Sequence, residues 1–366
     1  MVDIEKISII GLGLMGGSFA LALKNKGFRG TITGYDISKN CVKEALQTQA
    51  IDVAAEGLGD AITDAEIVVI AVPISKYETV LEEIGEYLSP NCIVTDLGSV
   101  KVQALEMADR LLPKHVHFIG GHPMTGSERG GFKAADPFLY ENAYYFLTPK
   151  DNTPADAIKT IENIVKNLGA YTVHLSPSEH DLIVSRISHL PHIIAITLVN
   201  FIDKNMGISH LPFVGGGFRD TTRIASGDPG IWKDILFTNK EEIIKSIESF
   251  QLLLDEFRYC LEHDKDENIV QFLRNAKSIR DGVPHHGRGY MSPLYEITVS
   301  IEDKPGTIAE LTQLISSNNI NIKQIEILHS RQNKGGALRL AFESEKDQNL
   351  VLEILEQNGF HNIHCL

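Results

Sequence analysis

The sequence predicts three domains in succession: a doubly wound α/β domain at residues 1–175, an all-helical domain at 176–281, and a βαββαβ domain at 294–366. Three observations carry this prediction. Short runs rich in valine and isoleucine alternate with helical periodicity through the first part. Such runs stop through the second part. Strict apolar–polar alternation returns only after residues 282–293, a segment rich in glycine and proline that we interpret as a linker.

The strands expected in the first domain are continuous apolar runs rather than alternating ones. A run of this kind is buried on both faces, which is typical of a parallel sheet between two layers of helices. The clearest is at residues 66–72, which holds only apolar side chains after Glu66 and ends before Pro73. The other strands are expected at residues 7–10, 31–35, 92–95, 117–119, 143–147 and 171–175. This is the pattern of a Rossmann-type sheet.

The second domain is predicted from three long helical patterns, at residues 181–204, 240–260 and 267–280. Pro191 interrupts the first pattern, and residues 211–219, which include a run of three glycines, are expected to form a loop. The apolar stretches in these helices exceed what a thin bundle can bury alone. We therefore expect a two-fold homodimer through this domain.

The third domain begins with a strand at residues 295–301, in which apolar and polar side chains alternate as in a half-buried strand. Helices are expected at residues 308–315 and 350–355, and further strands at 320–328, 338–342 and 361–366. The apolar phase of the second strand shifts near Lys323, which suggests a bulge. The resulting order, βαββαβ, is that of a ferredoxin-like unit.

Composition argues against several classes of protein. The chain has 34 Lys and Arg against 48 Asp and Glu, and its net charge of −14 opposes nucleic-acid binding, which needs positive charge. No apolar run reaches about 18 residues, so no membrane span is expected, and the N-terminus does not read as a secretory signal. The four cysteines are scattered, which argues against a zinc cluster or a disulfide framework and favours a cytoplasmic location. No metal site is expected.

A glycine motif after the first strand predicts a nucleotide site. Gly11 permits a tight turn, Gly13 lets the backbone approach a pyrophosphate, and Gly16 lets helix and strand pack closely. Leu14 and Met15 complete this loop at the start of a helix, whose free N–H groups favour an anion. The alternative is a glycine-rich turn that binds no nucleotide.

The acidic residue Asp36 bears on the choice of dinucleotide. It lies about 20 residues after Gly16, at the end of the second predicted strand, where its carboxylate can accept hydrogen bonds from ribose hydroxyls. A 2′-phosphate would be repelled there, so the sequence favours NAD over NADP. Lys39 is near enough to weaken that preference.

Two polar clusters follow predicted strands, where open α/β sheets bind ligands. In the first, DLGSVK, Ser99 is a candidate site residue or the N-cap of the next helix, and Lys101 is a site residue or a surface charge. In the second, GGHPMTGSE, His122 titrates near neutrality and can accept a proton from a substrate hydroxyl, or it only hydrogen-bonds a turn. Glu128 either orients a group in the cleft or forms a surface ion pair.

A third cluster lies in the helical domain. His189 and His192 are three residues apart in SHLPH and share a helix face, although each alone is more often a satisfied core residue than a ligand. The later stretch GGGFRDTTR contains Arg219, Asp220 and Arg223. Guanidinium groups bind carboxylates through a bidentate fork, so the arginines are candidates for substrate capture. The alternative is a helix start with surface arginines.

Together these residues resemble the prephenate dehydrogenase family. The motifs GLGLMGGS, DLGSVK, GGHPMTGSE, SHLPH and GGGFRDTTRIA occur in that order, and the resemblance covers nearly all of residues 5–280. It implies oxidative decarboxylation of prephenate to 4-hydroxyphenylpyruvate in tyrosine biosynthesis, with NAD accepting the hydride.

The same resemblance implies roles for individual residues. In such enzymes the histidine matching His122 contacts the ring hydroxyl of prephenate, and the serine matching Ser99 supports that contact. The arginine matching Arg223 binds a substrate carboxylate with help from the histidine matching His192. The residues matching Glu128 and Asp220 complete or gate the pocket.

The C-terminal stretch EDKPGTIA resembles an ACT domain. Such domains commonly bind amino acids, and one attached to this kind of dehydrogenase implies feedback control by tyrosine. The turn formed by Asp303, Pro305 and Gly306 precedes a helix whose free N–H groups could receive an amino-acid carboxylate. Alternatively, the turn only joins a strand to a helix.

Three rival functions fit parts of the sequence. An arogenate dehydrogenase would share the fold and the mechanism. A β-hydroxyacid dehydrogenase would need a catalytic lysine on a helix, and no comparably placed lysine is found. A regulator that senses nucleotide and amino acid would have an inactive site.

Overall fold

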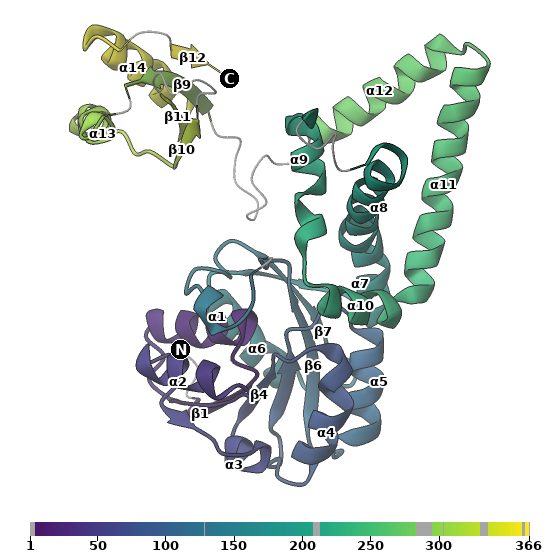
Figure 1. The fold of residues 1–366 in the computed structure, drawn as a ribbon. Coiled ribbons are helices and arrows are strands. Elements are labelled where there is room, and N and C mark those ends of the chain that lie inside the picture. The colour runs from purple at the N-terminus through teal and green to yellow at the C-terminus, as the bar shows by residue number, and fades with distance from the viewer. Residues whose placement is uncertain are drawn as a thin grey trace. The chain divides into compact units, whose positions relative to one another are not determined.

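The computed structural model describes residues 4–127, 129–207, 213–282, 295–302, 304–329, 336–360 and 363–365. The chain divides into two compact units, Met1–Ser278 and Ile279–Leu366. The first holds a large sheet with its covering helices and a set of longer helices, and the second holds a smaller sheet (Figure 1). Most of the predicted linker lies outside the described residues, and the domain boundaries given above stay a prediction.

The large sheet has eight strands in the order β3-β2-β1-β4-β5-β6-β7-β8. Its strands are β1 (Lys6–Ile10), β2 (Thr31–Tyr35), β3 (Val53–Ala54), β4 (Ile67–Ile70), β5 (Ile93–Asp96), β6 (His117–Pro123), β7 (Tyr144–Thr148) and β8 (Tyr171–His174). The helices between them are α1 (Leu14–Asn25), α2 (Lys39–Gln47), α3 (Leu58–Ile62), α4 (Tyr77–Gly85), α5 (Val102–Leu111) and α6 (Ala155–Asn167). The crossing order β2-β1-β4 confirms the doubly wound topology.

Burial on both faces explains why the central strands are mostly apolar. In β4, Ile67 and Val69 belong to a core shared with α1 and α6, whereas Val68 and Ile70 belong to a second core shared with α3, α4 and α5. Successive side chains of a strand point to opposite faces, so a strand covered on both faces is mostly apolar, and the polar residues it does hold, such as Ser8 and Thr95, are buried as well. Each buried valine or isoleucine contributes about 1.5–3 kcal/mol.

One pair of strands departs from the parallel pattern. β6 and β7 are antiparallel, with His122 opposite Phe146, while the other pairs in this sheet are parallel. The connection between them carries the short 3-10 turn η2 (Phe132–Ala134) but no α-helix among its described residues. Parallel neighbours need a long crossover, usually a helix, and without one the chain re-enters the sheet in the opposite direction.

A long helical path leads out of the sheet. It comprises α7 (Pro177–Val184), a π-helical turn η3 (Ser185–His189) and α8 (Leu190–Met206). Pro191 therefore does not break the helix: it sits in the first turn of α8, directly after the π turn, where a missing N–H is tolerated. The helical segment Pro177–Asn205 is long and apolar enough to cross a membrane, judged by length and composition alone. The share of its most apolar window that is buried is 28%.

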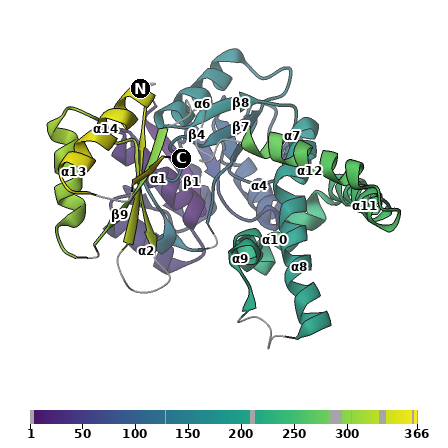
Figure 2. The same ribbon diagram turned by 90° about the horizontal axis from the view of Figure 1, so that it is seen from above.

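The remaining helices complete the first unit. They are α9 (Gly216–Thr222), the 3-10 turn η5 (Arg223–Ser226), α10 (Pro229–Thr238), α11 (Lys240–Glu262) and α12 (Asp266–Asp281). The loop expected at residues 211–219 is thus partly wrong, because a helix already begins at Gly216; residues 208–212 lie outside the described part of the chain. Figure 2 shows α11 and α12 extending away from the large sheet.

The C-terminal unit is an antiparallel sheet in the order β10-β11-β9-β12 with two helices. Its elements are β9 (Tyr295–Ile301), α13 (Thr307–Ser317), β10 (Gln324–His329), β11 (Gly336–Phe342), α14 (Glu345–Gln357) and β12 (Ile363–Cys365). Strand order and helices confirm the ferredoxin-like prediction. The phase shift near Lys323 marks the start of β10 rather than a bulge: Ile320 packs in the core before the strand begins.

Candidate active site

The glycine loop between β1 and α1 has the geometry of a nucleotide-binding turn. Gly11 has φ +94°, and a Cβ there would lie 2.6 Å from the carbonyl oxygen of Ala71. Gly13 is the N-cap of α1, no side chain caps the helix, and a Cβ built on Gly13 would have nothing within 4 Å. The first N–H groups of α1, from Leu14 and Met15, thus face a position that protein side chains leave open to an anion.

Asp36 lies beside this loop, directly after β2. Its Oδ2 accepts a hydrogen bond from the backbone N–H of Leu12 (2.7 Å), and its Oδ1 accepts one from Ser38 (2.7 Å). Both bonds fix the carboxylate at the edge of the glycine loop. A ribose held by the loop would therefore meet an oriented acceptor, and the residues present fit a dinucleotide.

A buried ion pair joins the ends of β5 and β6. Lys101, which is 1% exposed, contacts the Asp96 carboxylate and donates from Nζ to the carbonyl of Gly121 (2.7 Å). Asp96 also accepts from the Tyr77 hydroxyl and from the N–H groups of Gly98 and Gly121. Lys101 is therefore not a surface charge. Burial lowers the pKa of the Lys101 ammonium, and the neighbouring Asp96 carboxylate opposes that shift.

His122 lies within β6 and is 8% exposed. Its Nδ1 is 2.7 Å from Nε2 of His180 on α7, and Nδ1 of His180 is 2.7 Å from Oδ1 of Asp181. Burial lowers the pKa of His122 well below its ordinary value, and the nearby His180 and Lys101 add to that shift. His122 is thus neutral near pH 7 and able to accept a proton.

The structure does not give Ser99 the capping role considered above. Lys101 is the N-cap of α5, and the carboxylate of Asp181 bonds the N–H groups of Lys101 (2.8 Å) and Val102 (2.9 Å) at the start of that helix. Ser99 is half-buried in the turn after β5. Its predicted contact with a hydroxyl at His122 stays a prediction, and Glu128 lies outside the described residues.

A second group of rings lies further along the same helical path. The rings of His192 and Trp232 are stacked, with centroids 3.4 Å apart and planes at 5°, and His189 meets Trp232 edge-on. His192 is 3% exposed, and among the described residues its Nδ1 has no hydrogen-bond partner. Burial lowers the pKa of His192, opposed by a hydrogen bond to the backbone of Ile224. The neighbouring His189 is held by Asn239 at 3.3 Å, and burial lowers its pKa to about 4.

The predicted carboxylate-binding residues lie on the next two elements. Asp220 is in α9 and Arg223 begins η5; both side chains are exposed, and η5 packs against α8. The hydrogen bond of His192 to Ile224 thus places that ring beside the turn that carries Arg223. One helical path therefore contacts His122 through α7 and the Arg223 turn through α8, while convergence of His122 and Arg223 on one pocket stays a prediction.

The predicted effector turn precedes α13. Gly306 has φ +100° and is the N-cap of that helix, with Pro305 before it. Asp303 lies outside the described residues. The turn joins β9 to α13, and its role in effector binding stays a prediction.

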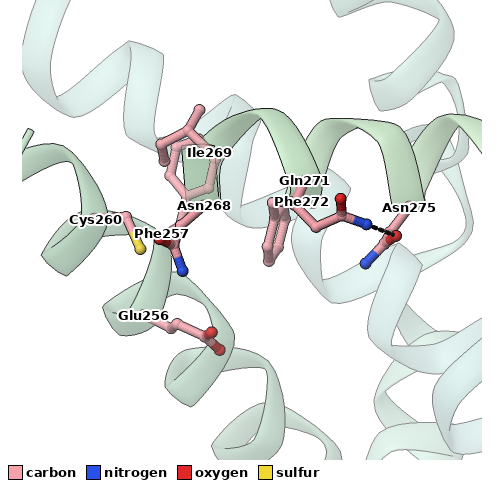
Figure 3. Close-up of a pocket in the computed structure, with 8 residues that line it drawn as sticks. All are labelled: Glu256, Phe257, Cys260, Asn268, Ile269, Gln271, Phe272 and Asn275. Carbon is pink, nitrogen blue, oxygen red and sulfur yellow. Dashed lines mark hydrogen bonds between the residues drawn. The ribbon is translucent and has the colours of Figure 1, made fainter. Parts of the chain in front are cut away.

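A cavity of about 150 Å³ lies between α11 and α12, away from the residues above (Figure 3). Phe257 and Phe272 meet edge-on in its wall, and Gln271 donates to Asn275 on the α12 side. Its lining includes Cys260 but none of the predicted site residues. It is a crevice of the helical hairpin and holds no chemistry suited to hydride transfer.

Comparison with known proteins decides the family. Residues 19–174 match the model of the prephenate dehydrogenase nucleotide-binding domain, 176–275 that of the prephenate dehydrogenase dimerization domain, and 295–360 that of the ACT domain. The prephenate dehydrogenase of Bacillus subtilis is 37% identical over 96% of both chains, and that of Lactococcus lactis is 34% identical over 96% of this chain and 98% of the relative. The chain belongs to the prephenate dehydrogenase family.

Solved structures of the prephenate dehydrogenase family agree. The prephenate dehydrogenase of A. aeolicus, crystallised with hydroxyphenyl propionate and NAD+, has a TM-score of 0.73 and 32% identity, covering 77% of this chain and 99% of that one. Synechocystis arogenate dehydrogenase has a TM-score of 0.67 and 29% identity, covering 75% and 99%. The three family-model matches, together with the solved structures, confirm the expected order of a Rossmann-type, a helical and an ACT domain.

Sequence reasoning missed several residues of this site. Asp181 was assigned only to the start of an apolar helix and His180 to no element, although an aspartate within a long apolar helical pattern signals a buried partner. Trp232, the single tryptophan, and Asn239 carried no motif. Their roles follow from contacts between elements far apart in the sequence, which periodicity does not report.

Proposed function

We propose that the chain catalyses the NAD-dependent oxidative decarboxylation of prephenate to 4-hydroxyphenylpyruvate, a step of tyrosine biosynthesis. The observation that carries the proposal is His122: a buried, neutral imidazole on a strand end of the nucleotide-binding sheet, already hydrogen-bonded at Nδ1. The similarity to prephenate dehydrogenases over nearly the full chain supports the choice of substrate.

The cofactor is NAD. Gly11, Gly13 and Gly16 provide the turn, Leu14 and Met15 offer N–H groups to the pyrophosphate, and Asp36 accepts from the ribose. When NAD is bound, it supplies the acceptor for the hydride that leaves C4 of the substrate ring.

His122 handles the proton in this reaction. It accepts the proton of the ring hydroxyl as the C4 hydride leaves, and the oxygen becomes a carbonyl. The bond between the ring and its carboxylate then breaks, carbon dioxide departs, and the electron pair makes the ring aromatic. The phenolate oxygen regains a proton from His122, so no net proton is released. Ser99 supports the contact at the hydroxyl.

Substrate orientation falls to residues of the helical part. Arg223 binds the side-chain carboxylate with help from His192, whose unpartnered Nδ1 is a polar atom without a protein ligand. Glu128 and Asp220 complete or gate the pocket. With Arg223 and His192 on the side-chain carboxylate, the ring carboxylate stays free to leave as carbon dioxide. Positioning of the substrate and proton transfer together supply the catalysis.

A direct assay tests the proposal. The purified protein should reduce NAD in the presence of prephenate, with weaker activity toward NADP because Asp36 repels a 2′-phosphate. Arogenate, which carries an ammonium in place of the keto group, is the second candidate substrate, favoured by the likeness to Synechocystis arogenate dehydrogenase. Absence of NADH formation with both substrates would overturn the assignment.

The helical part supplies the surface for a homodimer. Exposed apolar side chains gather on α8 and α11, namely Val199, Phe201, Leu252, Leu253 and Leu254, and residues 176–275 match a dimerization domain. Covering such a surface removes apolar area from water. Light scattering should report a dimer or a tetramer, and a monomeric mass would exclude the assembly.

The ACT domain is the proposed site of feedback inhibition by tyrosine, through Asp303, Pro305 and Gly306. Tyrosine should inhibit the full chain but not a chain ending at Asp281. Equal inhibition of both would place tyrosine in the active site instead. The proposed location is the cytoplasm, and neither a membrane nor a nucleic acid is a proposed partner. The net charge of −14 supports the absence of a nucleic-acid partner.

A further inference from the structure

We propose that His180 and Asp181 are positioning residues that hold His122 with its proton on Nδ1, so that Nε2 is the atom that receives the substrate proton. The proposal deepens the function proposed above and rests on His122 acting as the base. It assigns roles to two residues that no motif singled out.

Asp181 is an acceptor at both oxygens. It is 3% exposed, its Oδ1 accepts from the N–H of Lys101, and its Oδ2 accepts from the N–H of Val102. These two groups open α5, where the helix dipole favours a negative charge. Asn239 donates to the backbone carbonyl of Asp181 (2.9 Å) and steadies its position. The carboxylate is therefore ionised and has no proton to donate.

The carboxylate determines the tautomer of His180. Because Oδ1 of Asp181 only accepts, the 2.7 Å contact requires a proton on Nδ1 of His180. His180 is fully buried, and burial lowers its pKa despite the opposing effect of Asp181. The ring is therefore neutral, and its Nε2 holds a lone pair.

The tautomer of His180 in turn determines that of His122. Two lone pairs cannot face each other at 2.7 Å, so Nδ1 of His122 donates to Nε2 of His180. Nε2 of His122 is left without a proton. Phe146 on β7 meets both rings edge-on, with centroids 6.4 Å from His122 and 5.6 Å from His180, and limits their rotation.

Burial and the charge of Lys101 lower the pKa of His180, whereas the Asp181 and Asp96 carboxylates raise it, and the lowering effects prevail. Lys101 lies at the start of α5, Asp96 at the end of β5 and His189 in the π turn, and each influences the titration of His122 or His180. The positive Lys101 disfavours an imidazolium at His180, the one form that would reverse the hydrogen bond. When His122 takes the substrate proton, its Nδ1–H points to a ring that Asp181 holds as an acceptor, which stabilises the new positive charge.

The direct test is ¹⁵N NMR of histidine-labelled protein, which distinguishes a protonated from a bare ring nitrogen. The wild-type protein without substrate should show His122 protonated at Nδ1 and bare at Nε2, and the His122→Asn variant assigns the signals. A proton on Nε2 of His122 at neutral pH would overturn the proposal. This measurement needs no turnover. If the protein proved inactive on prephenate, the proposed function would be wrong, and the NMR experiment would still report the tautomer of His122.

Two substitutions at His180 give the kinetic test. His180→Phe removes the acceptor and should lower kcat by about 10–100-fold with little change in KM, the usual cost of losing a partner that orients a reacting group. His180→Gln offers an amide oxygen to Nδ1 of His122 and should recover most of the loss. A structural role alone would affect both variants alike, and a His180→Phe enzyme with wild-type kcat would contradict the proposal.

Asp181→Asn tests the charge, and Glu179→Gln is its control. Glu179 lies on the same helix, is exposed and caps the N-terminus of α7 rather than touching His180. Loss of the Asp181 charge should lower kcat by about tenfold and shift the acidic limb of the kcat profile to lower pH, because the imidazolium of His122 loses support. Glu179→Gln should leave both unchanged, and an unshifted limb in Asp181→Asn would count against the role of its charge.

Discussion

The two ends of the candidate site are built differently. At one end, His122 is buried in a strand and linked by hydrogen bonds to His180 and Asp181. At the other, Arg223 is exposed at the start of a 3-10 turn. His122, the residue proposed to transfer the proton, is therefore pre-oriented by contacts within one chain. Arg223, the residue proposed to bind a carboxylate, is less buried, so we expect the buried end to govern the rate and the exposed end to govern affinity.

We expect the largest effect from removing the imidazole of His122, the proposed base. His122→Asn should lower kcat by about 10²–10⁴, the usual contribution of general base catalysis, while the affinity for NAD stays within a few-fold. Steady-state kinetics and NAD titration measure the two quantities. A folded His122→Asn enzyme with full turnover would mean that the buried end does not carry the chemistry.

The rigidity of the buried end depends on Lys101. Lys101→Met leaves the Asp96 carboxylate buried without its partner, and should lower the free energy of unfolding by about 3–5 kcal/mol. Urea unfolding measures it. Lys24→Met is the matched control, because Lys24 pairs with Asp52 near the surface, where a pair contributes about 0–1 kcal/mol. Equal losses in both variants would show that burial adds nothing at Lys101.

We expect acid to destabilise the helical path that carries the buried His180 and His189. Burial lowers the pKa of His189 from 6.5 to about 4. Between pH 6.5 and about 4, His189 is therefore protonated in the unfolded chain and neutral in the folded chain. The free energy of unfolding falls across that window by about 3 kcal/mol. His122 and His180 are shifted in the same direction and add to the fall.

Urea unfolding at a series of pH values checks this expectation. His189→Gln should flatten the dependence between pH 6.5 and 4. The exposed His263 provides the control, since His263→Gln should leave the slope as it is. A slope equally steep in His189→Gln would place the acid sensitivity elsewhere.

Arg223 tests the role proposed for the exposed end of the site. Arg223→Ala should raise KM for prephenate by roughly 10–100-fold, since a hydrogen bond to a charged group contributes about 1.5–3 kcal/mol, with a smaller effect on kcat. Arg110→Ala, which removes a surface arginine paired with Glu78, should change neither parameter. A fall in kcat with KM unaltered would transfer Arg223 from substrate affinity to the chemical step.

The sequence predicted the fold better than the site, for reasons visible in particular residues. The run at 66–72 marks β4 because a strand buried on both faces is mostly apolar, and the GxGxxG motif marks the loop between β1 and α1 because Gly11 needs a positive φ. Lys101 was left open as a surface charge, since nothing local reveals that Asp96 and Gly121 enclose it. The antiparallel β6–β7 pair was missed because its apolar pattern resembles that of parallel strands.

The single tryptophan gives the protein a built-in optical reporter. Trp232 stacks on His192, next to the turn that carries Arg223. An indole in contact with an imidazole changes its emission when the imidazole gains a proton or a neighbour. Fluorescence therefore offers a way to follow occupancy of the exposed end in the absence of turnover, with every other signal in that spectral range coming from tyrosine and phenylalanine.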